Sequence, residues 1–85
     1  MKKDELIKIL QESIAFRERD IAERQVDIDN YQTSLQILDE KYAINPDVKT
    51  YRPHLEELLR TAILEQTKVK IFLEAAQVNL AKLTD

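Results

Sequence analysis

The chain has no glycine and no cysteine among its 85 residues, and its two prolines, Pro46 and Pro53, both lie near the middle. Glycine supplies the positive φ of tight strand turns and phosphate-binding loops, so its absence argues against strand-rich folds and Gly-rich nucleotide sites. Without cysteine the chain has no disulfide, no thiolate metal ligand and no cysteine nucleophile. We therefore expect one small helical domain over residues 1–85.

The charges are mixed, with 13 basic and 16 acidic residues and a formal net charge of −3. A nucleic-acid-binding surface needs a basic patch, so this balance argues against nucleic acid as a partner. The amino-terminal "MKKDELIKIL" has no long apolar run and no small-residue cleavage site. We expect neither a signal peptide nor a membrane contact, and we expect a cytoplasmic location.

Apolar residues recur at alternating spacings of three and four in the first half of the chain, which is typical of one face of a helix. The seven-residue repeat favours a coiled coil. We call this line of positions the first seam, and it predicts a helix over about 3–43. Its members are Ile7, Leu10, Ile14, Arg17, Ile21, Arg24, Ile28, Tyr31, Leu35, Leu38 and Tyr42.

The second half carries a matching line of positions, the second seam, whose members are Leu55, Leu59, Ala62, Gln66, Val69, Leu73, Ala76, Leu80 and Leu83. Asn45 is a good helix N-cap and Pro46 suits the first helical position. We expect a turn at about 44–45 and a helix over about 46–83. Because an interior proline removes a backbone hydrogen bond, we expect a kink or break near Pro53.

Two antiparallel registers remain open. In one, Ile14 lies opposite Ala76 and the turn centres on Asn45 and Pro46. In the other, shifted by one heptad, Ile21 lies opposite Ala76 and residues 44–52 form a loop. We favour the first, because it uses both helices fully.

Several apolar side chains lie off both seams, which predicts a surface that a second molecule covers. A two-helix hairpin is also marginally stable alone. The fold class we expect is all-α, an antiparallel two-helix coiled-coil hairpin that dimerises into a four-helix bundle. The candidate dimer or partner interface contains Ile9, Phe16, Leu58, Ile63 and Phe72.

Three polar residues, Arg17, Arg24 and Gln66, occupy seam positions. The arginine stems can lie along the seam while the guanidinium groups reach water or a nearby acid such as Asp20 or Asp27. The alternative is a buried polar layer that fixes register and oligomeric state.

Candidate chemical sites are weak. His54 and Glu57 share a helical face, but the chain has no second histidine for a metal site. No nucleophile arrangement is evident, so we expect no catalytic, cofactor-binding or metal-binding residues and no enzyme activity. The acidic run from Glu18 to Asp29 is interleaved with arginines, which favours a solvated face over nucleic-acid mimicry.

The function we expect is a non-enzymatic protein–protein interaction module, an adaptor, inhibitor or assembly factor, with itself and an unidentified protein as partners. The alternative is an acidic nucleic-acid mimic or phage-type accessory inhibitor of a host nucleic-acid-binding protein. The paired heptads and the absence of glycine resemble many small helical-hairpin proteins, among them adaptor coiled coils and phage accessory proteins. That resemblance implies an architecture only.

Overall fold

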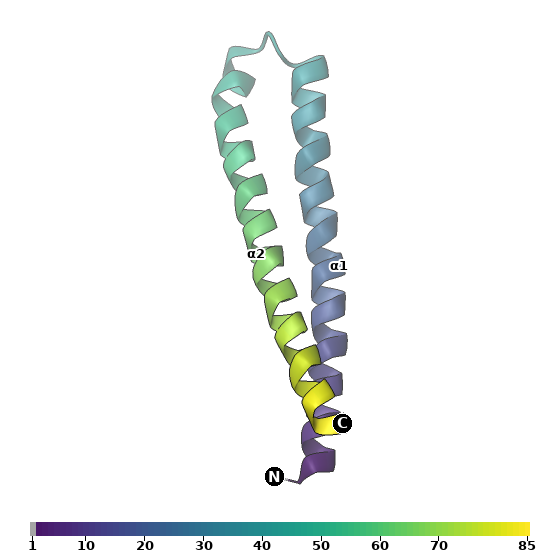
Figure 1. The fold of residues 1–85 in the computed structure, drawn as a ribbon. Coiled ribbons are helices and arrows are strands. Elements are labelled where there is room, and N and C mark those ends of the chain that lie inside the picture. The colour runs from purple at the N-terminus through teal and green to yellow at the C-terminus, as the bar shows by residue number, and fades with distance from the viewer. Residues whose placement is uncertain (1) are drawn as a thin grey trace.

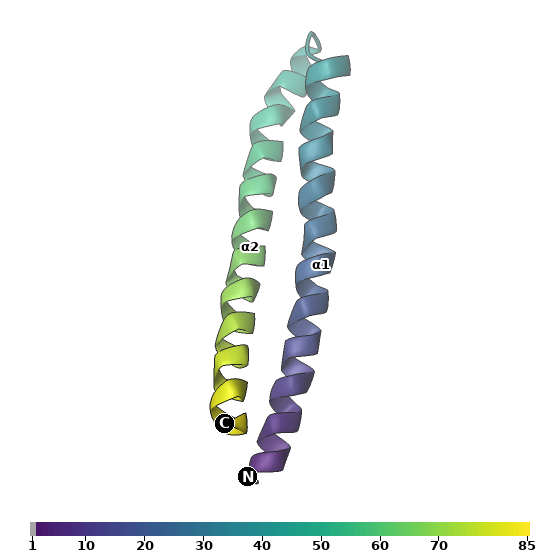
Figure 2. The same ribbon diagram turned by 45° about the vertical axis from the view of Figure 1, so that its right-hand side comes forward.

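The computed structural model describes residues 2–85 as two helices of equal length, α1 (Lys3–Lys41) and α2 (Pro46–Thr84), with no strand in this range. The helices run antiparallel and lie side by side along their length in both views, so that the two termini meet at one end (Figures 1 and 2). The predicted all-α hairpin is confirmed.

The two seams face each other and form the only interior of the described chain. Every member of the first seam from Ile7 to Leu38 is half-buried or buried, and so is every member of the second. The most buried members among residues 2–85, each with 6% or less of its surface exposed, are Ile28, Leu55, Gln66 and Ala76. A heptad pattern selects the positions that one neighbouring helix covers, which explains why the burial follows the repeat so closely.

The register is the one that opposes Ile14 to Ala76. The Arg52 guanidinium reaches Asp39, with Nη2 2.9 Å from Oδ2, and the Gln66 amide nitrogen lies 3.1 Å from the Ile21 carbonyl oxygen. The shifted register would place Gln66 beside Tyr31 instead. It would also need a loop over residues 44–52, where the chain is helical from Pro46.

The turn covers residues 42–45 and is longer than the two residues expected. α1 ends at Lys41, and the Tyr42 N–H donates to the Leu38 carbonyl at 3.0 Å. Asn45 is the N-cap of α2, since its side-chain oxygen accepts from the N–H groups of Asp47 and Val48. Tyr42, the next position of the first seam, lies beyond the end of α1 at Lys41 and is 47% exposed. The buried part of the first seam therefore ends at Leu38.

α2 continues through Pro53 without a break, and the kink that was the other expectation at this residue stays a prediction. Proline fixes φ near its helical value, so it disturbs the ladder through the missing N–H and a clash with the carbonyl four residues earlier. About two turns precede Pro53 within α2. Val48 and Arg52 on those turns are half-buried against α1, and Leu55, just after the proline, is buried. Packing of this face stabilises the helix across the proline.

The molecule is a rod of 62 × 18 × 14 Å with a radius of gyration of 19.0 Å. A compact chain of this length would have a radius of about 12 Å. The accessible surface is 6501 Å², against about 5,200 Å² for a typical folded monomer of this mass. The rod therefore exposes more surface than a compact chain of its mass, and this surface includes many large apolar side chains.

Candidate protein-interaction surface

Two exposed phenylalanines, one on each helix, flank an arginine from the first seam. Phe16 is 64% exposed and Phe72 is 58% exposed. The Arg17 guanidinium carbon lies 4.4 Å from the centre of the Phe72 ring and 5.8 Å from that of Phe16. A cation over an aromatic face is attracted by the ring quadrupole, so Arg17 links the two helices here. We call Phe16, Arg17 and Phe72 the aromatic cluster.

The two seam arginines behave differently. The Arg24 Nε lies 3.1 Å from Asp20 Oδ1, one helical turn earlier, as the pattern of acids around it suggests. The Arg17 Nε is buried without a hydrogen-bond partner among the described residues. Its guanidinium group lies against the aromatic rings, a contact that was not predicted from the sequence. Arg17 thus places a positive charge beside two exposed apolar rings.

Gln66 is the buried polar residue of the second seam, with 5% of its surface exposed. Its amide nitrogen donates to the Ile21 carbonyl at 3.1 Å and to the Gln25 side-chain oxygen at 2.9 Å. The register places Gln66 opposite Arg24, but its amide donates to Ile21 and Gln25, which lie before and after Arg24 on α1. A buried polar group whose hydrogen bonds form in a single alignment of the two helices favours that alignment.

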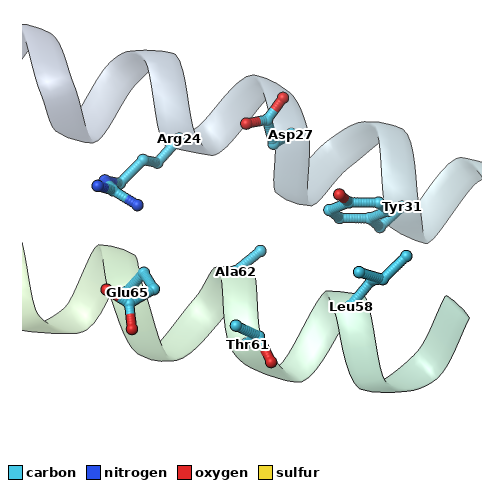
Figure 3. A pocket seen from close by; sticks show the side chains of 7 residues that line it. All are labelled: Arg24, Asp27, Tyr31, Leu58, Thr61, Ala62 and Glu65. Carbon is cyan, nitrogen blue, oxygen red and sulfur yellow. The ribbon is translucent and has the colours of Figure 1, made fainter. Parts of the chain in front are cut away.

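A shallow groove of about 210 Å³ opens beside the seam next to Arg24. It is lined by Arg24, Asp27, Tyr31, Leu58, Thr61, Ala62 and Glu65. Figure 3 shows the Tyr31 ring lying over Leu58 and the Arg24 side chain reaching toward α2. The volume is below the range of about 300–1,000 Å³ typical of small-molecule sites.

Glu65, at the edge of this groove, is held ionised by its neighbours. Its carboxylate accepts a hydrogen bond from Lys68 Nζ at 2.9 Å. This bond and the charge of Lys68 lower the Glu65 pKa, with a smaller contribution from Arg24. The groove is therefore edged by a paired carboxylate near neutral pH.

Charged residues also join the helices near the turn. The Arg52 guanidinium donates two hydrogen bonds to Asp39, at 3.0 and 2.9 Å, and also contacts Glu56. These bonds lower the pKa of Asp39 and raise that of Arg52. Arg52 lies one turn before Leu55, where the second seam begins, so its ion pair with Asp39 extends the interhelical contact to the last turn of α1.

The predicted interface residues divide into two groups. Ile9 and Phe16 lie one heptad apart on the same face of α1, and Ile9 is 48% exposed. Phe72 and Leu58 flank one edge of the second seam, whereas Ile63, 42% exposed, flanks the other edge. Leu58 is half-buried in the groove. The structure therefore brings Phe16 and Phe72 together, and it separates Ile63 from them.

An apolar line on the outer side of α2 was not singled out from the sequence. Leu64 is 54% exposed and begins a line with Ile71 and Val78, which are 64% and 49% exposed. These residues recur every seven positions on the side of α2 that faces away from α1. The sequence carries this signal as a third heptad line. The second seam, which lies two residues away along α2, is the stronger pattern and obscured it.

The remaining candidates stay isolated. The His54 ring centre lies 5.9 Å from that of Tyr51, and residues 2–85 contain no group of three or more potential metal ligands. In the acidic run, Asp20 and Glu23 pair with Arg24 and Arg19 at 3.1 and 2.9 Å. Neither helix, within the described range, has the length and apolarity to cross a membrane.

No protein-family model matches the chain, and no curated protein or solved structure matches it.

Proposed function

We propose that this protein is a non-enzymatic protein–protein interaction module that binds through the aromatic cluster and the apolar side chains around it. The observation that carries this proposal is the exposure of both phenylalanines beside Arg17. Aromatic side chains and arginine are enriched in the cores of protein interfaces. The extended rod formed by residues 2–85 also suits binding over a long surface.

The first partner in this proposal is a second copy of the chain, and the assembly is a four-helix bundle. The support is the accessible surface that the rod has beyond that of a typical monomer of its mass. A standard interface covers about 800 Å² on each partner, so a second copy can cover much of this excess. Covering this area removes exposed apolar groups from water and raises the stability of a marginal hairpin. The surface that the bundle leaves exposed then binds another protein, as an adaptor, inhibitor or assembly factor does.

The experiment compares three immobilised proteins: wild type, the double variant Phe16→Asp/Phe72→Asp, and Ile44→Asp. Ile44 is 95% exposed in the turn, far from the cluster, so its change is a matched apolar-to-acid control. Each protein is tested for capture of a tagged second copy and of proteins from a cell lysate. Wild type and Ile44→Asp should capture the same partners, and the double variant should lose at least tenfold. Equal capture by all three would refute the proposed surface.

The second candidate, an acidic mimic that inhibits a nucleic-acid-binding protein, rests on the run from Glu18 to Asp29. Asp20 and Glu23 already pair with arginines on the same helix, which weakens the field that such a mimic needs. It would be favoured over the first candidate if a captured partner bound DNA and released this protein as salt or DNA was added.

A further inference from the structure

The first two turns of α2, residues 46–52, are joined to the rest of the helix by an incomplete set of backbone hydrogen bonds. Pro53 follows them within α2 and has no N–H, so the Lys49 carbonyl lacks its usual donor four residues on. The proline ring also crowds this carbonyl. We call residues 46–52 the leading segment. The backbone of α2 is therefore weaker at the end of this segment than along the rest of the helix.

The leading segment also buries little surface against α1. Val48 and Arg52 are half-buried, and its other residues are exposed. A hollow of about 170 Å³ lies between the segment and the end of α1, with Leu38, Tyr42 and Val48 in its lining. Side chains beside an unfilled space lose part of their attractive contacts. Packing therefore holds this segment less firmly than the turn that follows, where Leu55 is buried.

The side-chain hydrogen bonds at the start of the segment are local. Asn45 Oδ1 accepts from the N–H groups of Asp47 and Val48 at 3.0 and 3.3 Å. Thr50 Oγ1 donates to the Pro46 carbonyl at 3.3 Å. These bonds shape the first turn, but they connect it neither to α1 nor to the helix beyond the proline.

Arg52 connects the leading segment to both of its neighbours. Its guanidinium group donates to Asp39 on α1 at 3.0 and 2.9 Å, and it contacts Glu56 on the far side of the proline. Among residues 2–85, the pair with Asp39 is the one ion pair that joins the two helices, since each of the others links residues of the same helix. Both side chains of this pair are partly exposed, so salt weakens it.

The sequence supplies a second helix start directly after the segment. A helix that begins at Pro53 carries its proline at the first helical position, where the missing N–H costs no hydrogen bond. Glu56 and Glu57 then lie close to the new N-terminus, where negative charge is favourable. A residue before proline also disfavours helical backbone angles, and Arg52 is that residue. Unwinding of the segment therefore has a defined end.

We propose that the leading segment opens as one unit while the rest of the hairpin stays folded, and that Arg52 holds it closed. Opening replaces the turn over residues 42–45 by a longer connection over residues 42–52, and α2 then begins at Pro53. It uncovers Leu38 and Val48 at the end of the rod opposite the two termini (Figure 1). The segment lies far from the aromatic cluster, so this inference does not depend on the proposed self-association.

Amide hydrogen exchange, read residue by residue by NMR, tests whether the segment opens as a unit. In the open form the amides from Thr50 to Glu56 lose their acceptors, all of which lie within residues 46–52. These amides should therefore share one protection factor, several-fold below that of the amides from Glu57 onward. Pro53→Ala should raise the shared protection factor and reduce this step, whereas His54→Ala should keep it.

The variant Asp39→Asn tests the role of Arg52. It removes the negative charge that Arg52 contacts on α1, so the shared protection factor of residues 50–56 should fall several-fold, while amides from Glu57 onward change much less. Asp29→Asn, on the same helix but without a contact to the segment, is the matched control and should resemble wild type. Added salt should lower the shared protection factor in wild type and change it much less in Asp39→Asn.

Three results would overturn the inference in distinct ways. Protection that rises gradually along α2, without a step at Glu57, would show ordinary fraying of a helix end. A single protection factor throughout α2 would show that the segment opens only with the whole hairpin. A step that is equally large in Asp39→Asn and Asp29→Asn would leave the opening unit in place and refute the role of Arg52.

Discussion

At the scale of single residues, polar side chains between the helices decide the alignment. The sequence located Arg17, Arg24 and Gln66 in the seams, because the heptad repeat alone assigns those positions. It offered Asp20 or Asp27 as partners for the arginines, and Arg24 pairs with Asp20, but it did not find the contacts of Arg17 and Gln66. Those depend on which way each long side chain turns: Arg17 turns onto Phe72, and Gln66 turns toward Gln25. Such choices follow from local packing and hydrogen bonding, which the repeat does not encode.

Gln66 offers a test of what a buried polar residue contributes. Gln66→Ala should lower the free energy of unfolding by about 1–3 kcal/mol, because it leaves a cavity and removes two hydrogen bonds. Gln66→Leu fills the space with apolar atoms, so it should stay within about 1 kcal/mol of wild type or exceed it. Urea unfolding followed by circular dichroism measures both. A leucine variant less stable than the alanine variant would contradict this account.

The ion pair between Asp39 and Arg52 should make stability depend on pH. Hydrogen bonds from Arg52 lower the Asp39 pKa in the folded state, below its unfolded value of about 3.9. The stabilisation is therefore complete above that value and is lost as the pH falls through the folded pKa. Asp39→Asn should be less stable than wild type at neutral pH.

The comparison at low pH completes this test. At a pH below the folded pKa of Asp39 the wild-type carboxyl is also protonated, so the difference between wild type and Asp39→Asn should disappear. Urea unfolding at both pH values measures it. The surface variant Asp29→Asn serves as the control for removing one negative charge. A difference that persists unchanged in acid would show that Asp39 acts through something other than its charge.

At the scale of the helices, capping and packing together set the boundaries. The start of α2 could be predicted from Asn45 and Pro46, because an N-cap and a first-turn proline act through adjacent backbone atoms. The end of α1 was less predictable, since Tyr42 and Ala43 continue a helical composition without a stop signal. The continuity through Pro53 was missed because packing of Arg52 and Leu55 against α1 outweighs a local cost.

Pro53→Ala should measure that local cost. Alanine restores an N–H that can donate to the Lys49 carbonyl, and it removes the ring clash, so the free energy of unfolding should rise by about 1–3 kcal/mol. His54→Ala changes the neighbouring exposed position and keeps the proline, which makes it the matched control. If Pro53→Ala were no more stable than His54→Ala, the proline would carry no strain within α2.

At the scale of the whole molecule, the rod shape follows from two heptad seams joined by a short turn. The hairpin was predictable, because the repeats define one buried face on each helix. The line of Leu64, Ile71 and Val78 was not recognised, because a third heptad line matters only once the first two have been assigned to the hairpin. Many large apolar side chains stay exposed on the rod, and this is the physical basis of the proposed association.

The central claim is that the hairpin binds a second copy of itself, and sedimentation equilibrium tests it most directly. Wild type should approach twice the 10.0 kDa chain mass as concentration rises. Phe16→Asp/Phe72→Asp should remain near the single-chain mass, while Ile44→Asp should follow wild type. A wild-type mass of one chain at every concentration, with the helices intact, would contradict the account.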